Sequence, residues 1–153
     1  MTALVSARPF QFRLERVRVL RERAEQQRAE ELAASVAHKR QGEEQLEAAA
    51  ERVDGARHVR RSVASATGAD LLSMQAYIDR TQRAQHAAAL DLGRREADVH
   101  ARRAALVHAA REHRALTRLE ERRRAEHGRE VARVEGAHMD EIALSVHRRS
   151  VNL

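Results

Sequence analysis

The 153-residue chain contains a single proline, Pro9, and nothing after it forces a helix to end. Proline breaks helices because it lacks a backbone N–H and its ring clashes with the preceding turn. The sequence after Pro9 consists mainly of alanine, leucine, valine, arginine and glutamate in uninterrupted runs. That composition is typical of long helices that pack along a narrow seam.

A large aromatic core is excluded, because the only aromatic residues are Phe10, Phe12 and Tyr77. The chain also lacks cysteine, which excludes disulfides and thiolate metal sites and fits a reducing compartment. No apolar run approaches the roughly 20 residues of a membrane span. The first nine residues lack the apolar stretch of a secretory signal. We therefore expect a cytosolic helical protein.

The first half of the chain carries apolar residues three and four positions apart. The predicted stripe consists of Leu14, Val17, Leu20, Ala24, Leu32, Val36, Leu46, Ala49, Val53, Ala56 and Val63. This spacing predicts an amphipathic helix near residues 10–63, with a slip in the repeat between Ala24 and Leu32. Turn-forming residues then follow at 63–69, where Thr67 or Asp70 can cap a second helix.

A second stripe, with alternating spacings of three and four, predicts a helix near residues 69–148. Its positions are Leu71, Met74, Ile78, Thr81, Gln85, Ala88, Leu92, Arg95, Val99, Arg102, Leu106, Ala109, His113 and Leu116. Nine of these fourteen positions are apolar, as expected for a coiled-coil seam. The pattern weakens beyond Leu119, and a last apolar group lies between Met139 and Val146.

Two long amphipathic helices joined by a short turn predict an all-α fold, an antiparallel coiled-coil hairpin. With the turn centred near Thr67, the second helix overhangs the first by about 25 residues, roughly 35–40 Å. We expect a flexible tail at 1–9, the hairpin at 10–149 and a C-terminal tail at 150–153. The formal charge is +4 over residues 1–23, −2 over 24–101 and +4 over 102–153, so folding back brings two basic ends together.

The residues argue against catalysis and against a metal site. Glu135 and His138 have the Glu-x-x-His spacing of di-iron bundles, but such a site needs two such pairs and two further glutamates. There is no glycine-rich phosphate loop, and a hairpin closes no pocket. We predict no catalytic residue, no metal, no cofactor and no small-molecule substrate; the chain is not an enzyme.

Binding to nucleic acid is the alternative that the charge suggests. Arginine-rich helices bind phosphate, and the isoelectric point is about 11.1. The arginines are nevertheless interleaved with glutamates and do not form one continuous stripe, and there is no aromatic stacking platform. These features argue against nucleic acid as a partner. Membrane-surface helices need a bulky apolar face, which is also missing.

Four motifs carry a family resemblance. They are the segment FRLERVRVLR at 12–21, Glu43-Glu44-Gln45-Leu46, the pair Tyr77-Ile78, and Glu135 followed by Met139-Asp140-Glu141-Ile142-Ala143. In order and spacing they resemble FliJ, the small coiled-coil protein of the flagellar type III export apparatus. The resemblance covers about residues 10–149.

This resemblance implies a fold like the two-helix stalk in the gamma subunit of rotary ATPases. The implied partners are the hexameric flagellar export ATPase, the cytoplasmic domain of the export gate, and export chaperones. The implied role is to promote assembly of the ATPase ring and couple it to proton-driven export, in a protein of bacterial flagellar motility and chemotaxis. It places the protein in the cytoplasm, peripheral at the inner membrane. The stalk proteins of injectisomes are similar and remain an alternative.

Two docking sites are expected from the resemblance and the residues together. Tyr77, with Gln45 and Ala84, is expected to mark the gate-binding surface; alternatively, Tyr77 simply packs across the hairpin. The ATPase-binding residues are expected to be Arg13, Arg16, Arg18, Arg21, Arg122, Arg123, Arg124, Arg129 and Arg133. The alternative for these arginines is pairing with Glu120, Glu121, Glu126 and Glu130 on a solvated face. The apolar group at Met139–Val146 would add an anchor.

Overall fold

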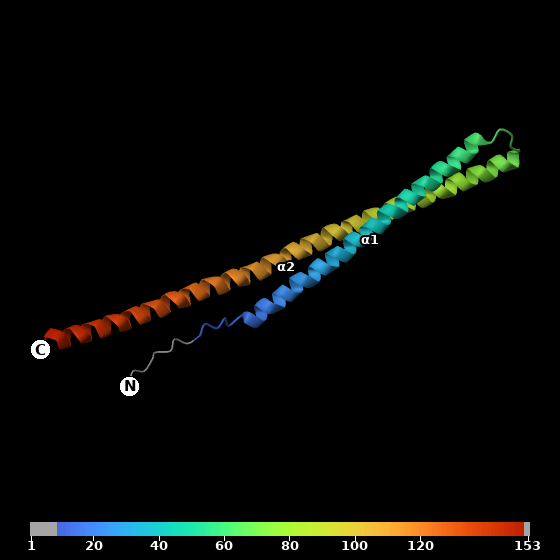
Figure 1. The fold of residues 1–153 in the computed structure, drawn as a ribbon. Coiled ribbons are helices and arrows are strands. Elements are labelled where there is room, and N and C mark those ends of the chain that lie inside the picture. The colour runs from blue at the N-terminus through green and yellow to red at the C-terminus, as the bar shows by residue number, and fades with distance from the viewer. Residues whose placement is uncertain (1–8, 152–153) are drawn as a thin grey trace. The chain divides into compact units, whose positions relative to one another are not determined.

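The fold is an antiparallel hairpin of two long α-helices, as predicted. The computed structural model describes residues 9–151, in which α1 spans Glu15–Ser62 and α2 spans Gly68–Val151. Figure 1 shows the two helices running in opposite directions from the turn at 63–67. Residues 1–8 and 152–153 of the expected tails lie outside the described residues. Residues 150 and 151 still belong to α2.

A reciprocal cap begins α2 at the predicted place. The Thr67 backbone N–H donates to Asp70 Oδ2 at 2.9 Å, and the Asp70 N–H donates back to Thr67 Oγ1 at 3.2 Å. Each residue thereby satisfies a backbone donor that has no partner inside the helix. Hydrogen bonds from Thr67 hold the pKa of Asp70 below its usual value.

The first helix begins later than predicted, because residues 10–14 are not helical. The first helical N–H, that of Glu15, donates to Phe12 O at 3.1 Å. Phe10 lies beside α2 instead, with its ring centroid 5.7 Å from that of His127 and 5.5 Å from the Arg124 guanidinium carbon. The apolar residues of this segment therefore predicted a helix, whereas the segment is not helical and its Phe10 packs against His127 of α2.

Both helices pass through two compact units, residues 24–109 and residues 1–23 with 110–153. In the 24–109 unit, the predicted seam of α2 is confirmed at Ile78, Thr81 and Val99, which are all buried. Ala109, the last seam residue of this unit, is buried as well. Leu71 is the exception, at 51% exposed, because it lies beside the turn.

The predicted stripe on α1 is partly wrong. Val36 is 46% exposed and Val63 is 37% exposed, and Leu14, Val17 and Leu20 are also exposed. The face that actually packs consists of Leu32, Ser35, Lys39, Gly42, Leu46, Ala49, Val53 and Ala56. This repeat of three and four is continuous from Leu32 onward, and the predicted slip between Ala24 and Leu32 lies before it. Five of its eight positions were predicted, and the other three were missed because they are small or polar.

Two of those small and polar residues, Ser35 and Gly42, contact side chains of α2. Ser35 Oγ donates to Asp98 Oδ2 at 2.7 Å. Arg95 lies against Gly42 and donates to the His38 carbonyl at 2.8 Å. The centre of the 24–109 unit is therefore a polar seam, whereas Val53 and Ile78 make an apolar one nearer the turn.

The other unit has no buried residue among its described positions, 9–23 and 110–150. Here α1 begins opposite the middle of the α2 segment, because Arg18 reaches Glu120 at 3.3 Å. Beyond Val131, side chains as far as Ser150 are exposed except for Ser145. The overhang of α2 is thus confirmed within this unit. Over the described residues, neither helix has an apolar stretch that could cross a membrane.

Candidate functional site

A groove near the turn contains the predicted aromatic residue. Its volume is about 430 Å³, and its apolar lining comes from Ala56 and Val59 on α1 and from Met74 and Tyr77 on α2. Tyr77 is 48% exposed, with the Arg80 guanidinium carbon 5.9 Å from its ring centroid. The tyrosine therefore forms part of a wall between the helices and still offers half of its surface to a partner.

The other two residues expected at the gate surface lie apart from each other. Ala84 is exposed on α2, two turns from Tyr77. Gln45 is on α1 and accepts a hydrogen bond from Arg95 at 3.3 Å. Residues 77 and 95 are separated by roughly 27 Å along α2. The structure thus places Tyr77 and Ala84 along one helix but does not bring Gln45 to the groove.

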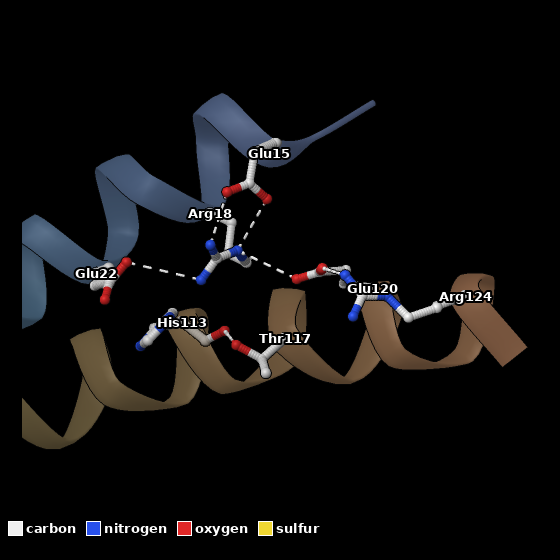
Figure 2. Close-up of polar contacts among 7 residues, drawn as sticks. All are labelled: Glu15, Arg18, Glu22, His113, Thr117, Glu120 and Arg124. Carbon is white, nitrogen blue, oxygen red and sulfur yellow. Dashed lines mark hydrogen bonds and ion pairs between the residues drawn. The ribbon is translucent and has the colours of Figure 1, made fainter. Parts of the chain in front are cut away.

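At the basic end, two of the predicted arginines tie α1 to α2. Arg18 donates two hydrogen bonds to Glu15, at 2.7 and 3.1 Å, and its Nε lies 3.3 Å from Glu120 (Figure 2). Arg21 reaches Glu112 at 2.9 Å. The hydrogen bonds from Arg18 lower the pKa of Glu15, and the same contact raises the pKa of Arg18. Both arginines hold the hairpin together.

Four further predicted arginines pair with glutamates of α2 itself. Arg124 donates to Glu120 at 3.0 Å, as Figure 2 also shows. Arg123 donates to Glu126 at 3.1 Å, whereas Arg122 is 3.9 Å from the same carboxylate. Arg133 donates to Glu130 at 2.6 Å. These one-turn pairs are exposed and screened by water, so their arginines can exchange partners.

Arg13, Arg16 and Arg129 differ from the rest of the predicted set. They are exposed and form no ion pair within residues 9–150. Three arginines that the prediction omitted, Arg111, Arg114 and Arg118, have the same properties. Their spacing of three and four on the helix was the signal that could have found them.

The non-helical segment at the start of the chain makes a hollow against α2. Its volume is about 880 Å³, with Phe10, Phe12 and Leu14 on one side and Leu119 and His127 on the other. Arg13 and Arg123 lie at its edge. The apolar group farther along α2 is open to solvent, since Met139 is 64% exposed and Ile142 is 41% exposed.

Metal-binding clusters are missing from the described part of the chain. No three of its histidine, aspartate and glutamate side chains lie close enough to hold an ion. Glu135 and His138 therefore stand without further ligands there. The charged residues described above form ion pairs or lie exposed on the surface.

Comparison with known proteins identifies the family. The family model described as "Flagellar FliJ protein" matches residues 10–152. The chain belongs to the flagellar FliJ family. This FliJ-family protein is therefore related to flagellar protein export, as the motifs at 12–21 and 135–143 predicted. Comparisons with curated proteins and with solved structures found no match.

Within this FliJ-family chain, the geometry around the two predicted docking regions could be anticipated from the sequence to different extents. The basic end could be anticipated because the arginines cluster in number. Which of them are free depends on where the glutamates point, and that follows from packing. The groove beside Tyr77 was not predicted, since it needs Val59 of α1 beside Met74 of α2.

Proposed function

We propose that this FliJ-family protein is a stalk of the flagellar export apparatus that binds the export ATPase hexamer through its basic end. The observation that carries the proposal is the location of charge. Residues 24–109 hold thirteen basic and thirteen acidic residues, so the entire formal charge of +6 lies in the remaining residues. A rod that enters a ring lined by acidic residues needs its positive charge on the end that enters, here residues 1–23 and 110–153.

The contact is expected to be electrostatic and adaptable. A two-helix rod inside a six-fold ring cannot meet all subunits with the same shape, so attraction over several ångströms suits it better than a single interlock. The free arginines, Arg13, Arg16 and Arg129, are available for an acidic partner at no cost in broken pairs. Arg122 is the next most available, with its glutamate 3.9 Å away.

The test is stimulation of the ATPase by a variant in which Arg13, Arg16 and Arg129 are changed to glutamate. We expect stimulation to fall at least about tenfold, and the stimulation by the parent chain to weaken as salt rises, because exposed charges are screened beyond about 10 Å at 0.1 M salt. The matched control changes Arg57, Arg61 and Arg94 of the 24–109 unit to glutamate. Equal stimulation by all three proteins, insensitive to salt, would contradict the proposal.

The gate contact is proposed for the groove that Tyr77 lines. An aromatic side chain with half of its surface exposed and apolar neighbours is typical of an interface anchor. Tyr77→Ala should weaken binding to the gate's cytoplasmic domain by about tenfold or more while leaving helicity unchanged. Leu72→Ala is the control, because Leu72 is 75% exposed and does not line the groove. Unchanged binding of Tyr77→Ala would rule the groove out.

Chaperone handling is proposed from the family alone, and no single residue of the chain is assigned to it. A pull-down of purified export chaperones by the intact chain would test chaperone handling, with an unrelated coiled coil of similar charge as the control. The location proposed for the protein, in the cytoplasm and peripheral at the inner membrane, follows from these partners.

A further inference from the structure

Five arginines of α2 form a single line on the face turned away from α1. They are Arg111, Arg114, Arg118, Arg122 and Arg129. At about 100° per residue they fall within an arc of roughly 80°. The residues that face α1 in this segment, such as His113, Leu116 and Glu120, are partly buried and lie on the opposite side. We call the five arginines the outer arginine line.

The outer arginine line is exposed, and most of its arginines are unpaired in the described residues. Within the part of the chain that the structure describes, four of its members form no ion pair or hydrogen bond, and Arg122 has only Glu126 at 3.9 Å. Two neighbouring glutamates are engaged across the hairpin, Glu112 with Arg21 and Glu120 with Arg18. Folding thus draws Glu112 and Glu120 toward α1, whereas Glu121 and Glu126 stay exposed at the edges of the line. Five positive charges therefore face two negative ones here, so the even mixing seen in the sequence does not hold on this surface.

The spacing of the line fits a chain of phosphates. Successive arginines from 111 to 122 are separated by roughly 4.5–6 Å along the axis, and the whole line extends over about 27 Å. That repeat is close to the distance between phosphates of a single strand. The guanidinium fork can also bind phosphate oxygens in pairs. A flexible strand can follow such a line without a shaped pocket.

The surroundings of the line disfavour other polyanions. Ala115 and Ala125 lie between the arginines, and the exposed Glu121 lies at one edge of the line. A membrane-surface helix needs bulky apolar residues, which these side chains do not supply. Arg111, Arg114 and Arg118 line neither of the two hollows described above. A folded acidic protein would therefore find little shape to recognise here. A phosphate backbone needs only charge and reach.

We propose that the outer arginine line binds the backbone of single-stranded nucleic acid without preference for sequence. Sequence-independence follows because no aromatic residue lies on this face to stack with bases, and because contacts to the phosphate backbone are the same for every sequence. The inference goes beyond the role in export. Its first three residues, Arg111, Arg114 and Arg118, are not among those assigned to the ATPase contact.

The experiment measures fluorescence anisotropy of a labelled oligothymidylate with the full chain over a range of salt. With about five phosphates contacted, the logarithmic salt slope should be about −3.5, which is roughly a 100-fold loss between about 50 and 200 mM salt. The variant Arg111→Gln, Arg114→Gln, Arg118→Gln should bind at least about tenfold more weakly and reduce the slope by about 2. Circular dichroism checks that its helices are intact.

The control removes the same charge elsewhere, with Arg57→Gln, Arg61→Gln and Arg94→Gln in the 24–109 unit. It should change affinity less than about threefold. Equal losses in both variants would mean that net charge alone attracts the strand, and would overturn the assignment. Tighter binding of polyglutamate, or of vesicles rich in phosphatidylglycerol, than of oligothymidylate would also overturn it. ATPase stimulation by the same glutamine variant separates this failure from a failure of the stalk proposal, because the latter depends on Arg13, Arg16 and Arg129.

Discussion

At the scale of single residues, the centre of the hairpin depends on a notch at Gly42. A Cβ atom there would lie 2.9 Å from Arg95 Cδ and 3.4 Å from Leu92 Cδ1. The missing side chain lets the aliphatic part of Arg95 lie flat across α1. From this position Arg95 donates to the His38 carbonyl and to Asp91, the latter at 2.7 Å. The glycine therefore lowers the helix propensity of α1 but leaves room for a contact between the two helices.

Replacing this glycine with alanine should show how the two effects balance in the stability of the protein. Gly93 is a helical glycine with no atom within 4 Å of its would-be Cβ, so Gly93→Ala should stabilise the protein by nearly the full propensity difference of about 1 kcal/mol. Gly42→Ala should gain clearly less, because Arg95 must shift. Thermal melts of the two variants compare the effects directly. An equal rise in Tm for both would show that the notch has no role.

Asp98 predicts how the hairpin responds to acid. The hydrogen bond from Ser35, and next that from Arg102 at 2.9 Å, hold the pKa of Asp98 below its usual value. A carboxyl whose pKa is lower in the folded state stabilises the fold above its unfolded pKa and loses that contribution as the pH falls through the folded pKa. Asp98→Asn should therefore reduce the loss of Tm between about pH 5 and pH 2.

Asp54→Asn provides the comparison for this pH effect, since Asp54 is exposed and its nearest arginine nitrogen is 4.0 Å away. Melting curves at matched salt should show a smaller change for Asp54→Asn than for Asp98→Asn. A parent-like acid profile in the Asp98 variant would mean that other carboxylates, such as Glu31 beside Arg28, account for the whole response.

At the scale of the helices, the interface repeats one polar unit with a seven-residue period. Asp91 and Arg95 form an ion pair at 2.7 Å, and Asp98 and Arg102 form the next at 2.9 Å. The α1 residues that face them, Gly42 and Ser35, are also seven positions apart. Polar groups that need specific partners fix the alignment of helices better than interchangeable apolar ones. This repeat explains why α1 packs by a face that is not its most apolar one.

Two valines of α1 test which face is packed. Val53 is 2% exposed and Val36 is 46% exposed, although both belong to the stripe expected from spacing. Val53→Ala should cost about 1–2 kcal/mol of unfolding free energy through a cavity. Val36→Ala should stay within about 0.5 kcal/mol of the parent, since it is a surface change in the same helix. Urea titration followed by circular dichroism gives both values. A larger cost for Val36→Ala would contradict the packing.

At the scale of the whole molecule, burial and charge are divided between the two units. Every residue that is buried, among those described, lies in 24–109, and this unit is electrically neutral. The unit formed by 1–23 and 110–153 carries the formal charge of +6, and Arg18 and Arg21 bridge its helices. One unit thus contains the buried residues that stabilise the fold, and the other carries the positive charge through which we propose that partners bind.

Hydrogen exchange should show this division in the intact chain. Amides buried under few apolar contacts open more readily, so helical residues of 15–23 and 110–130 should exchange faster than those around Val53 and Ile78. Raising the salt to about 1 M shortens the screening length to about 3 Å and should speed exchange further at 15–23 only. Uniform protection along both helices, or no response to salt, would contradict it.

The sequence by itself determined the elements of this protein. The absence of proline after Pro9, the turn residues near Thr67 and the three-four spacing of α2 depend on local chemistry, and each can be seen without knowing what packs against it. The family motifs could be recognised for the same reason. The start of α1 was misplaced, because Phe10 contacts His127 from a distant part of the chain.

Only the tertiary structure decided which face of each helix packs against the other helix. Whether Val36 or Ser35 points inward depends on Asp98, sixty-three positions away along the chain. Whether an arginine is held or free depends on where the facing helix puts a glutamate, as Arg18 with Glu120 and the unpaired Arg118 illustrate. The spacing of residues along one helix predicts neither outcome, because pairing between side chains of the two helices arises only when the second helix is in place.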